Sequence, residues 1–234
     1  MVSTDATQVT SRPAATGVGA RLVRADVLCM PAREVSLAYV AAKRAFDLGV
    51  AVLGLIALAP LLGIIAVAIR VGSSGPVVFK QRRPGLRGRP FWMLKFRTMT
   101  QDAEDRLPEV LPLNREPDHS LLRIPDDPRV TGVGRVLRRT SLDELPQLVN
   151  IVRGEMSLVG PRPISRPIAD ERALLRLAVR PGLTGLWQIN GRKETDCQFM
   201  LDKDMEYLAR RSFWFDLSIL LRTVPAVIRR NGAE

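Results

Sequence analysis

Two adjacent carboxylates, Asp143 and Glu144, stand in the segment TSLDELPQLVNIV, in front of an apolar helical pattern. One interpretation is a capping box, in which Ser141 caps the helix and Glu144 bonds back to it. That arrangement would put Pro146 at the fifth helical position, where its missing N–H removes a helical hydrogen bond. If the helix instead begins at Asp143, the proline falls in the first turn and both carboxylates lie at the exposed helix mouth.

The arginines that precede this acidic pair favour a chemical role. Arg135, Arg138 and Arg139 come shortly before it, and arginine beside a carboxylate favours the ionised acid at a site prepared for phosphate. An ionised carboxylate can act as a nucleophile that forms an acyl phosphate. A second carboxylate can hold Mg²⁺, which bridges phosphate oxygens during the displacement. The residue types therefore indicate phosphoryl transfer.

A long apolar segment lies upstream of the acidic pair. Residues 48–69 contain no charged side chain, and a helix of this length can cross a hydrocarbon core. The structural alternative is a buried core helix, although soluble core helices rarely run this long without a polar side chain. The segment therefore predicts an association with membrane lipids, and the phosphoryl transfer would then act on a lipid.

The flanks and the middle of this segment predict its topology. Lys43 and Arg44 precede it and Arg70 follows it, whereas a simple spanning helix would carry basic residues at one end. Pro60 predicts a break or a kink halfway along. A re-entrant hairpin that enters and leaves by the same face accounts for both features, and a kinked spanning helix is the alternative. Asp47 can pair with Lys43 and Arg44 at the interface.

The chain divides into three parts. Residues 1–35 predict a flexible tail, residues 36–72 a membrane-embedded helix, and residues 73–234 a catalytic domain. Within that domain, two short β-rich runs at 77–81 and 91–97 flank a turn that carries Pro84, Gly85 and Gly88, which predicts a β-hairpin. The fold class is thus a mixed α/β, mainly helical, membrane-associated domain with a re-entrant helix broken at Pro60.

The hairpin and the connection after it carry further candidates. The basic side chains Arg87, Lys95 and Arg97 suit phosphates or lipid head groups, and a solvated basic hairpin is the alternative. Residues 101–128 predict an irregular connection, and its histidine, His119, is expected at the surface.

The C-terminal half predicts helices and loops in turn. Apolar residues from Asp143 to Val152 follow helical spacing, and Gly154 is a normal helix stop. SLVGPRP and RPGLTGLWQINGR are Gly- and Pro-punctuated loops whose arginines, Arg162 and Arg192, can approach a phosphate. Residues 201–229 are helical in pattern, and the aromatic residues 213–215 fit either a helix in the membrane interface or ordinary core packing.

Composition limits the classes of partner. The 234 residues are 46% hydrophobic, which argues against general disorder, and the net charge of +11 implies an anionic partner. Nucleic acid, anionic lipid head groups and a phosphorylated small substrate all fit that charge. Cys29 and Cys197 fit neither a metal-ligand spacing nor a disulfide framework, which favours a reducing environment.

Four segments together resemble the bacterial sugar transferases, the monotopic polyprenyl-phosphate phosphoglycosyl transferases. They are KRAFDL, VFKQRRPGLRGRPFWMLKFRTM, DPRVTGVGRVLRRTSLDELPQLVNIVRGEMSLVGPRP and RPGLTGLWQINGR, and they occur in the order typical of that family. The resemblance covers about residues 40 to 230 and, as a set, is highly specific.

The resemblance implies transfer of a sugar-1-phosphate from a UDP-sugar to undecaprenyl or another polyprenyl phosphate, with release of UMP. By position, Asp143 would be the nucleophile that forms a phosphosugar-enzyme intermediate, Glu144 would help bind Mg²⁺, and Arg138 would contact a phosphate. Arg162 and Arg192 are weaker candidates for such contacts. The step would start assembly of exopolysaccharide, capsule, O-antigen or glycoprotein glycans at the cytoplasmic face of the bacterial inner membrane, upstream of other glycosyltransferases.

Two departures from the family pattern matter. Many members break the membrane helix at Ser-Pro, whereas this chain has Ala59-Pro60, so the hydroxyl that could satisfy a freed carbonyl is missing. Larger members also carry an N-terminal bundle of membrane helices, so this chain resembles a minimal catalytic form. A membrane-anchored anion-binding scaffold and a transferase that uses direct attack are the rival functions, and no nucleic-acid-binding motif is recognisable. The residues specify neither the sugar nor an oligomeric state.

Overall fold

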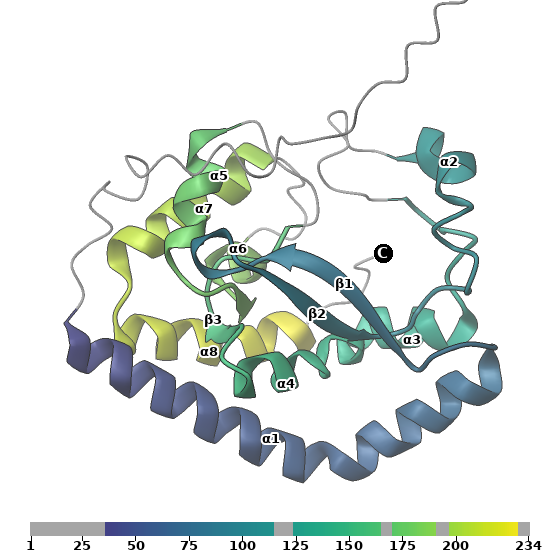
Figure 1. Ribbon diagram of the computed structural model, residues 1–234, viewed down its shortest axis with the longest axis horizontal. Coiled ribbons are helices and arrows are strands. Elements are labelled where there is room, and N and C mark those ends of the chain that lie inside the picture. The colour runs from purple at the N-terminus through teal and green to yellow at the C-terminus, as the bar shows by residue number, and fades with distance from the viewer. Residues whose placement is uncertain (1–35, 115–123, 165–169, 191–196, 229–234) are drawn as a thin grey trace, which may run out of the picture.

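The computed structural model describes residues 36–114, 124–164, 170–190 and 197–228. The predicted tail 1–35, His119 and Arg192 lie outside these residues. Within them the protein is mainly helical, as expected from the sequence, and it contains two small sheets. Figure 1 shows one long helix, α1, beneath a layer of shorter helices, with a β-hairpin rising above that layer.

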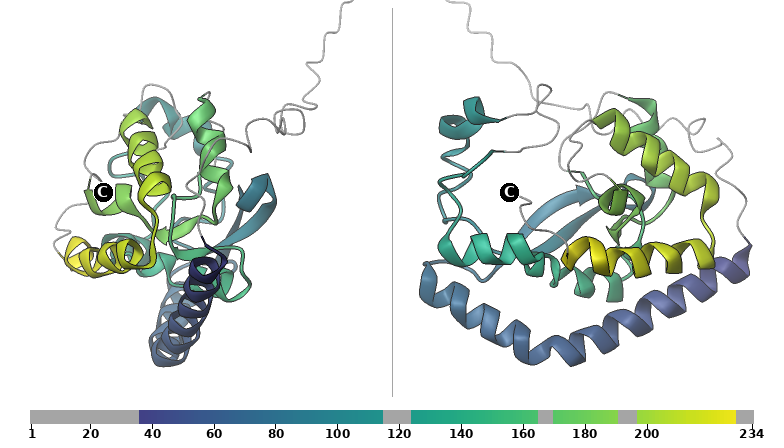
Figure 2. Two further views of the ribbon diagram at one scale, coloured as in Figure 1. Left: turned by 90° about the vertical axis from the view of Figure 1, so that its left-hand side faces the viewer. Right: turned by 180° about the vertical axis from the view of Figure 1, so that it is seen from behind.

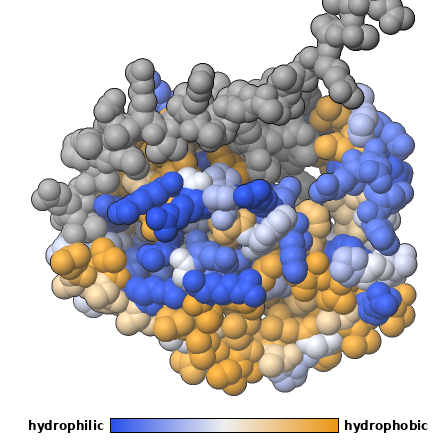
Figure 3. All heavy atoms as spheres, in the orientation of Figure 1, coloured by the Kyte–Doolittle hydropathy of each residue, from blue (hydrophilic) through white to orange (hydrophobic). Residues whose placement is uncertain are grey.

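The apolar segment forms helix α1, Leu37–Gly72, which Ser36 caps by accepting a hydrogen bond from the Tyr39 amide at 3.2 Å. Only 11% of the most apolar stretch of α1 is buried within the protein, whereas the core helix of a soluble protein is mostly buried. The alternative of a soluble core helix is therefore wrong. The helix is long and apolar enough to cross a membrane. Figure 3 shows the surface that α1 forms as an almost continuous hydrophobic area below a hydrophilic band.

Pro60 lies inside α1, and the helix continues without interruption from Leu37 to Gly72. The predicted break therefore takes the form of a bend, which is visible near the middle of α1 in Figures 1 and 2. Proline has this effect because it lacks the N–H that would donate to the carbonyl four residues earlier. The two arms of α1 rise from the bend toward the same side of the molecule.

The predicted hairpin is confirmed. Strands β1, Val78–Pro84, and β2, Pro90–Phe96, are antiparallel, with Val78 opposite Phe96 and Pro84 opposite Pro90. The short 3₁₀ turn η2, Leu86–Gly88, joins them, with Gly88 at φ +71°. The irregular connection that follows contains only a short helix, α2 at Leu107–Val110, and the 3₁₀ turn η3 at Leu111–Leu113 in its described part.

The acidic pair lies between two helices and not at the start of one. Helix α3, Gly132–Thr140, ends at Ser141, which adopts the left-handed conformation at φ +59° and acts as its C-cap. The 3₁₀ turn η4, Leu142–Glu144, follows, and α4, Gln147–Val152, begins only after Pro146. Ser141 makes no side-chain capping bond to η4, so the capping box is wrong. The helix start at Asp143 is also wrong, and the carboxylates occupy a separate turn.

The two Gly- and Pro-punctuated segments are more regular than the sequence suggested. Strand β3, Ser157–Val159, pairs in parallel with β4, Gly182–Thr184, and helix α6, Leu186–Asn190, follows β4. Between the strands lie α5, Glu171–Leu175, and the 3₁₀ turn η5, Arg176–Ala178. The prediction of two plain loops missed these elements because strands of three residues carry no clear periodicity.

Helices α7, Cys197–Arg210, and α8, Phe213–Ile228, complete the described chain. Within the aromatic segment, Phe215 packs against the core cluster and Phe213 contacts Phe46 of α1, which fits core packing, whereas Trp214 is exposed. The interfacial position of α8 stays a prediction. Seen from behind in Figure 2, α8 and α3 lie in line above the bend of α1. The layer of α3, α4 and α8 thus lies against the apolar helix, and β3 also contacts α1 directly through Ser157 and Asp47.

Candidate active site

Turn η4 rests directly on α1 and turns its carboxylates away from it. Leu142 and Leu145, on either side of the acidic pair, pack against the cluster that contains Ile65 and Ile69 of α1. The apolar residues of α4 continue this contact, since Leu148 lies 3.5 Å from where a side chain on Gly54 would begin. The two leucines that flank the carboxylates in LDEL thus hold the acidic pair next to the membrane helix.

Two cations from other elements meet the acidic pair. The Lys95 ammonium, on β2, lies 3.0 Å from Oε1 of Glu144 and 3.7 Å from Oδ2 of Asp143. The Arg162 guanidinium, on the loop after β3, lies 3.0 Å from the same Oε1. The structure therefore brings together four of the predicted site residues, which lie as much as 67 positions apart in the chain.

Asn150 fixes the strand that carries Lys95. This buried α4 side chain accepts a hydrogen bond from the Leu94 amide at 3.0 Å and donates to the Trp92 carbonyl at 2.7 Å. One amide thus replaces a neighbouring strand on β2 and locks that strand to the helix that follows the acidic pair. The distance between Lys95 and η4 is set by this contact.

The surroundings shift the pKa values of the two carboxyl groups in opposite directions. Burial acts to raise the pKa of Glu144, but Lys95 and Arg162 outweigh it and lower that pKa to about 2. Burial raises the pKa of Asp143, against the opposing charge of Lys95. Glu144 is therefore a fixed anion, whereas Asp143 is the more basic carboxylate and the better nucleophile once it is ionised.

The structure adds one cation that the sequence interpretation missed. Arg83 on β1 donates from Nη1 to the Pro163 carbonyl at 3.0 Å and from Nε to Gln81 at 3.1 Å. Burial and the neighbouring Arg162 lower its pKa to about 10, and Glu144 opposes them. A run of basic residues in the hairpin was visible in the sequence, but only the strand register shows which of them turns toward the acidic pair.

Arg138 contributes a further positive charge from α3. It is exposed, its Nε donates to Thr98 Oγ1 at 2.9 Å, and its charge acts to lower the pKa of Asp143. Lys95, Arg83, Arg138 and Arg162 thus oppose two carboxylates, which leaves a local excess of positive charge. Such an excess suits the oxygens of a diphosphate.

Two other predicted cations do not reach the acidic pair. Arg87 is exposed in η2 at the tip of the hairpin, beyond Pro90, which lies about 17 Å along β2 from Lys95 at 3.3 Å per residue. Arg97 is buried, and its Nη2 donates to the Ser73 carbonyl at 2.8 Å, next to the end of α1. Its contacts connect the hairpin to the membrane helix and do not place it at the site.

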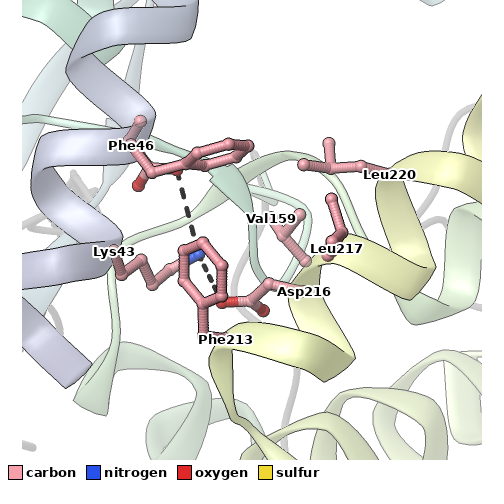
Figure 4. A pocket seen from close by; sticks show the side chains of 8 residues that line it. Lys43, Phe46, Val159, Phe213, Asp216, Leu217 and Leu220 are labelled. Atoms are coloured by element: carbon pink, nitrogen blue, oxygen red, sulfur yellow. Dashed lines mark ion pairs between the residues drawn. The ribbon is translucent and has the colours of Figure 1, made fainter.

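Three of the residues predicted for the membrane interface, Lys43, Arg44 and Asp47, join α1 to the domain. Lys43 lies 2.8 Å from Asp216 of α8 and 3.9 Å from Asp47, so the predicted Lys43–Asp47 pair is confirmed (Figure 4). Asp47 is buried and accepts a hydrogen bond from Ser157 at 2.6 Å. Arg44 does not pair with Asp47.

Arg44 instead binds the C-terminal end of α4. Its guanidinium donates to the Ile151 carbonyl at 2.6 Å and to the Val152 carbonyl at 3.0 Å. The Ile151 carbonyl also accepts a hydrogen bond from the Gly154 amide at 2.9 Å. A cation at a helix C-terminus interacts favourably with the helix dipole. The interaction therefore fixes the end of the helix that follows the acidic pair.

The donor set fits a magnesium ion held jointly with a substrate. Within the described residues, no group of three potential ligands surrounds a common point. Both cations bind Oε1 of Glu144, and none of the described contacts engages its Oε2. Mg²⁺ is commonly bound by one or two carboxylates together with substrate phosphates, which is the chemistry that this carboxylate can supply.

Comparison with known proteins gives a consistent family. A family model described as bacterial sugar transferase matches residues 38–230. The exopolysaccharide production protein ExoY of Sinorhizobium fredii is 43% identical over 197 residues, which cover 82% of this chain and 87% of ExoY.

Longer relatives match over part of their length. The UDP-glucose:undecaprenyl-phosphate glucose-1-phosphate transferase of Escherichia coli is 42% identical over 193 residues, 78% of this chain and 39% of that protein. The undecaprenyl-phosphate galactose phosphotransferase of Salmonella typhimurium is 38% identical over 200 residues, 82% of this chain and 41% of that protein. The acidic pair, the cations around it and these matches lead to one conclusion: the chain belongs to the bacterial sugar transferase family.

Proposed function

We propose that this protein transfers a sugar-1-phosphate from a UDP-sugar to undecaprenyl phosphate or another polyprenyl phosphate and releases UMP. The observation that carries the proposal is the position of Asp143 and Glu144. The pair lies in ionic contact with Lys95 and Arg162, and the turn that carries it packs against the membrane helix. The names of the relatives, which include glucose and galactose phosphotransferases acting on undecaprenyl phosphate, support the same reaction.

In the first step, an oxygen of the Asp143 carboxylate attacks the phosphorus that carries the sugar. A bond forms between that oxygen and phosphorus, the bond from phosphorus to the bridging oxygen breaks, and UMP leaves with that oxygen. The burial of Asp143 reduces hydration of the attacking oxygen, and Lys95 favours its ionised form. Arg138, Arg162 and Arg83 supply positive charge for the diphosphate.

In the second step, a phosphate oxygen of the lipid attacks the same phosphorus. The bond from Asp143 to phosphorus breaks, the carboxylate is regenerated, and the sugar diphosphate remains on the lipid. Two displacements at one phosphorus allow the soluble donor and the lipid acceptor to use the same site in turn. The packing of η4 against α1 supports access of a lipid phosphate to this site.

Magnesium is part of the proposal. Glu144 is the residue that would hold the ion, because it is ionised at all physiological pH values. When bound, Mg²⁺ would offset the negative charge of the phosphate oxygens and stabilise UMP as it leaves.

The expected location is the cytoplasmic face of the bacterial inner membrane. A helix whose two arms return to one domain supports entry and exit at the same face. The first arm is tied to that domain by Lys43 and Arg44, and the second by the contact between Arg97 and Ser73. A helix that spanned the bilayer would place its ends on opposite sides. The product would then be available to glycosyltransferases that extend an exopolysaccharide or a related glycan.

The test is release of UMP from a panel of UDP-sugars by detergent-solubilised protein with undecaprenyl phosphate and Mg²⁺. Wild-type protein should release UMP from at least one donor, and Asp143→Asn should lower turnover by at least about 10³-fold because an amide is a poor nucleophile. Asp102→Asn, a change at an exposed carboxylate, serves as the control and should keep full activity. Retained turnover in Asp143→Asn would remove this residue from the nucleophile role.

A covalent adduct distinguishes the two-step route from direct attack by the lipid. Wild-type protein incubated with a radiolabelled UDP-sugar and no lipid acceptor should retain the labelled sugar phosphate after denaturation, and Asp143→Asn should retain none. An active wild type that never carries label would favour direct attack. Absence of UMP release from any donor by folded protein would favour the scaffold function.

A further inference from the structure

The loop that presents Arg162 to the acidic pair has an unusual hydrogen-bonding requirement. Residues 160–163 read Gly-Pro-Arg-Pro, and the two prolines have no N–H with which to form regular backbone hydrogen bonds. The carbonyls of this loop therefore need donors from other parts of the chain. The structure supplies a separate donor to each of the last three carbonyls. They are the Gly182 amide to Pro161 at 2.9 Å, Arg176 Nη2 to Arg162 at 2.6 Å, and Arg83 Nη1 to Pro163 at 3.0 Å.

Arg176 is the buried member of this set. It belongs to η5, and its Nε lies 2.6 Å from Oδ2 of Asp204 on α7. The two side chains are 3% and 2% exposed, so both charges are removed from water. A buried ion pair of this kind contributes little net stability compared with an apolar pair of similar volume, because its desolvation is costly. Its contacts lead from Asp204 of α7 through Arg176 to the carbonyl of Arg162.

We propose that Arg176, held by Asp204, is a positioning residue that fixes Arg162 beside Glu144. Neither member of the buried pair contacts the acidic pair in the described structure, so its effect passes through the Arg162 backbone. One end of Arg162 is held by the Arg176 guanidinium and the other lies 3.0 Å from Glu144 Oε1. The inference rests on the proposed function only in that Arg162 must act on the diphosphate donor.

The variant must remove the donor without leaving a buried charge. Arg176→Met alone would strand Asp204, which would destabilise the domain. Arg176→Met combined with Asp204→Leu replaces the ion pair by apolar side chains of similar size and deletes the hydrogen bond to the Arg162 carbonyl. Arg176→Lys, which keeps a charge next to Asp204 but lacks the planar guanidinium, replaces the double variant if that variant melts far below wild type.

A double-mutant cycle with Arg162→Ala measures whether the buried pair acts through Arg162. In the wild-type background, the change of Arg176 and Asp204 should lower kcat/KM for UMP release by about 10²-fold, the scale expected for misplacing a contact by about 1 Å. In the Arg162→Ala background the same change should cost less than about threefold, because the group to be positioned is already gone. Equal losses in both backgrounds, or no loss in the first, would overturn the inference.

The matched control is an ion pair on neighbouring elements that does not reach the loop. Arg172 of α5 lies 2.5 Å from Asp202 of α7, and Asp202 is exposed. In the sequence, these two residues come shortly before Arg176 and Asp204. Arg172→Met with Asp202→Leu should leave kcat/KM within about twofold, and a loss equal to that of the buried pair would overturn the inference. Wild type that releases UMP from no donor would reject the proposed function, whereas active wild type with an additive cycle would reject only the positioning role.

Discussion

At the acidic pair, two neighbouring carboxyl groups acquire different properties from their surroundings. Glu144 meets two cations at 3.0 Å, and its pKa falls to about 2. Asp143 lies farther from Lys95, at 3.7 Å, and burial raises its pKa. Environments that move the pKa values of two adjacent acids apart suit them to different tasks, and here they support the proposed nucleophile role of Asp143 beside the permanent anion Glu144.

The pH dependence of turnover should report the charge of Lys95. Its ammonium acts to lower the pKa of Asp143, so Lys95→Met should raise that pKa further. Because the nucleophile must be ionised, the acidic limb of the kcat/KM profile should move to higher pH in this variant. Lys80→Met, at an exposed position on the other strand of the hairpin, should leave the limb in place. An unmoved limb in Lys95→Met would separate the ammonium from Asp143.

At the scale of elements, close backbone contacts hold the helix that carries Arg138. Gly134 of α3 faces the backbone of Thr98, and a Cβ on it would lie 2.0 Å from the Thr98 carbonyl oxygen. The same residue donates its amide to the Thr131 hydroxyl that caps α3, at 2.9 Å. Thr98 in turn receives the Arg138 guanidinium at 2.9 Å, so this contact fixes both the helix and its cation.

Replacing Gly134 should therefore affect both stability and activity. Gly134→Ala forces α3 away from Thr98 and should destabilise the domain by about 2 kcal/mol or more, with lower kcat/KM through Arg138. Gly132→Ala, in the same helix with nothing within 4 Å of the new Cβ, should change stability by less than about 1 kcal/mol. Thermal unfolding in detergent measures both, and equal melting temperatures would contradict the packing argument.

At the scale of the whole molecule, polarity is divided between two faces. The bend of α1 carries exposed apolar side chains, including Ile56 at 68% and Ile64 at 67%. Figure 3 shows a hydrophilic band above the hydrophobic area at the base of the molecule. A surface of this size without charge indicates contact with lipid. The charged site and the apolar helix are therefore parts of one arrangement for acting at a membrane.

Membrane binding should depend on these α1 side chains. Ile56→Lys combined with Ile64→Lys should release the protein from liposomes in a flotation assay, since each buried charge costs about 2.5 to 3.5 kcal/mol. Leu113→Lys, at a similarly exposed apolar position in η3 far from α1, should leave flotation unchanged. Undiminished flotation of the α1 variant would move the membrane contact to another surface.

Several features followed from the sequence because they are local or compositional. The uncharged run of residues 48–69, the β-hairpin and the order of the family segments are all visible without coordinates. The pairing of Lys43 with Asp47 follows from one turn of helix. The roles expected for Asp143, Glu144 and Arg138 came from the resemblance, and the magnesium and nucleophile assignments stay predictions.

Only the tertiary structure decided which charges meet. Sequence composition shows many arginines, but the register of β1 with β2 selects Arg83 and Lys95 for the site and leaves Arg87 at the hairpin tip. Contacts between residues far apart, such as Arg176 with Asp204, depend on how elements pack and have no local signal. The sequence by itself determined an acidic pair beside a membrane helix. The fold decided which cations surround that pair, because electrostatic interactions depend on distance in space and not on separation along the chain.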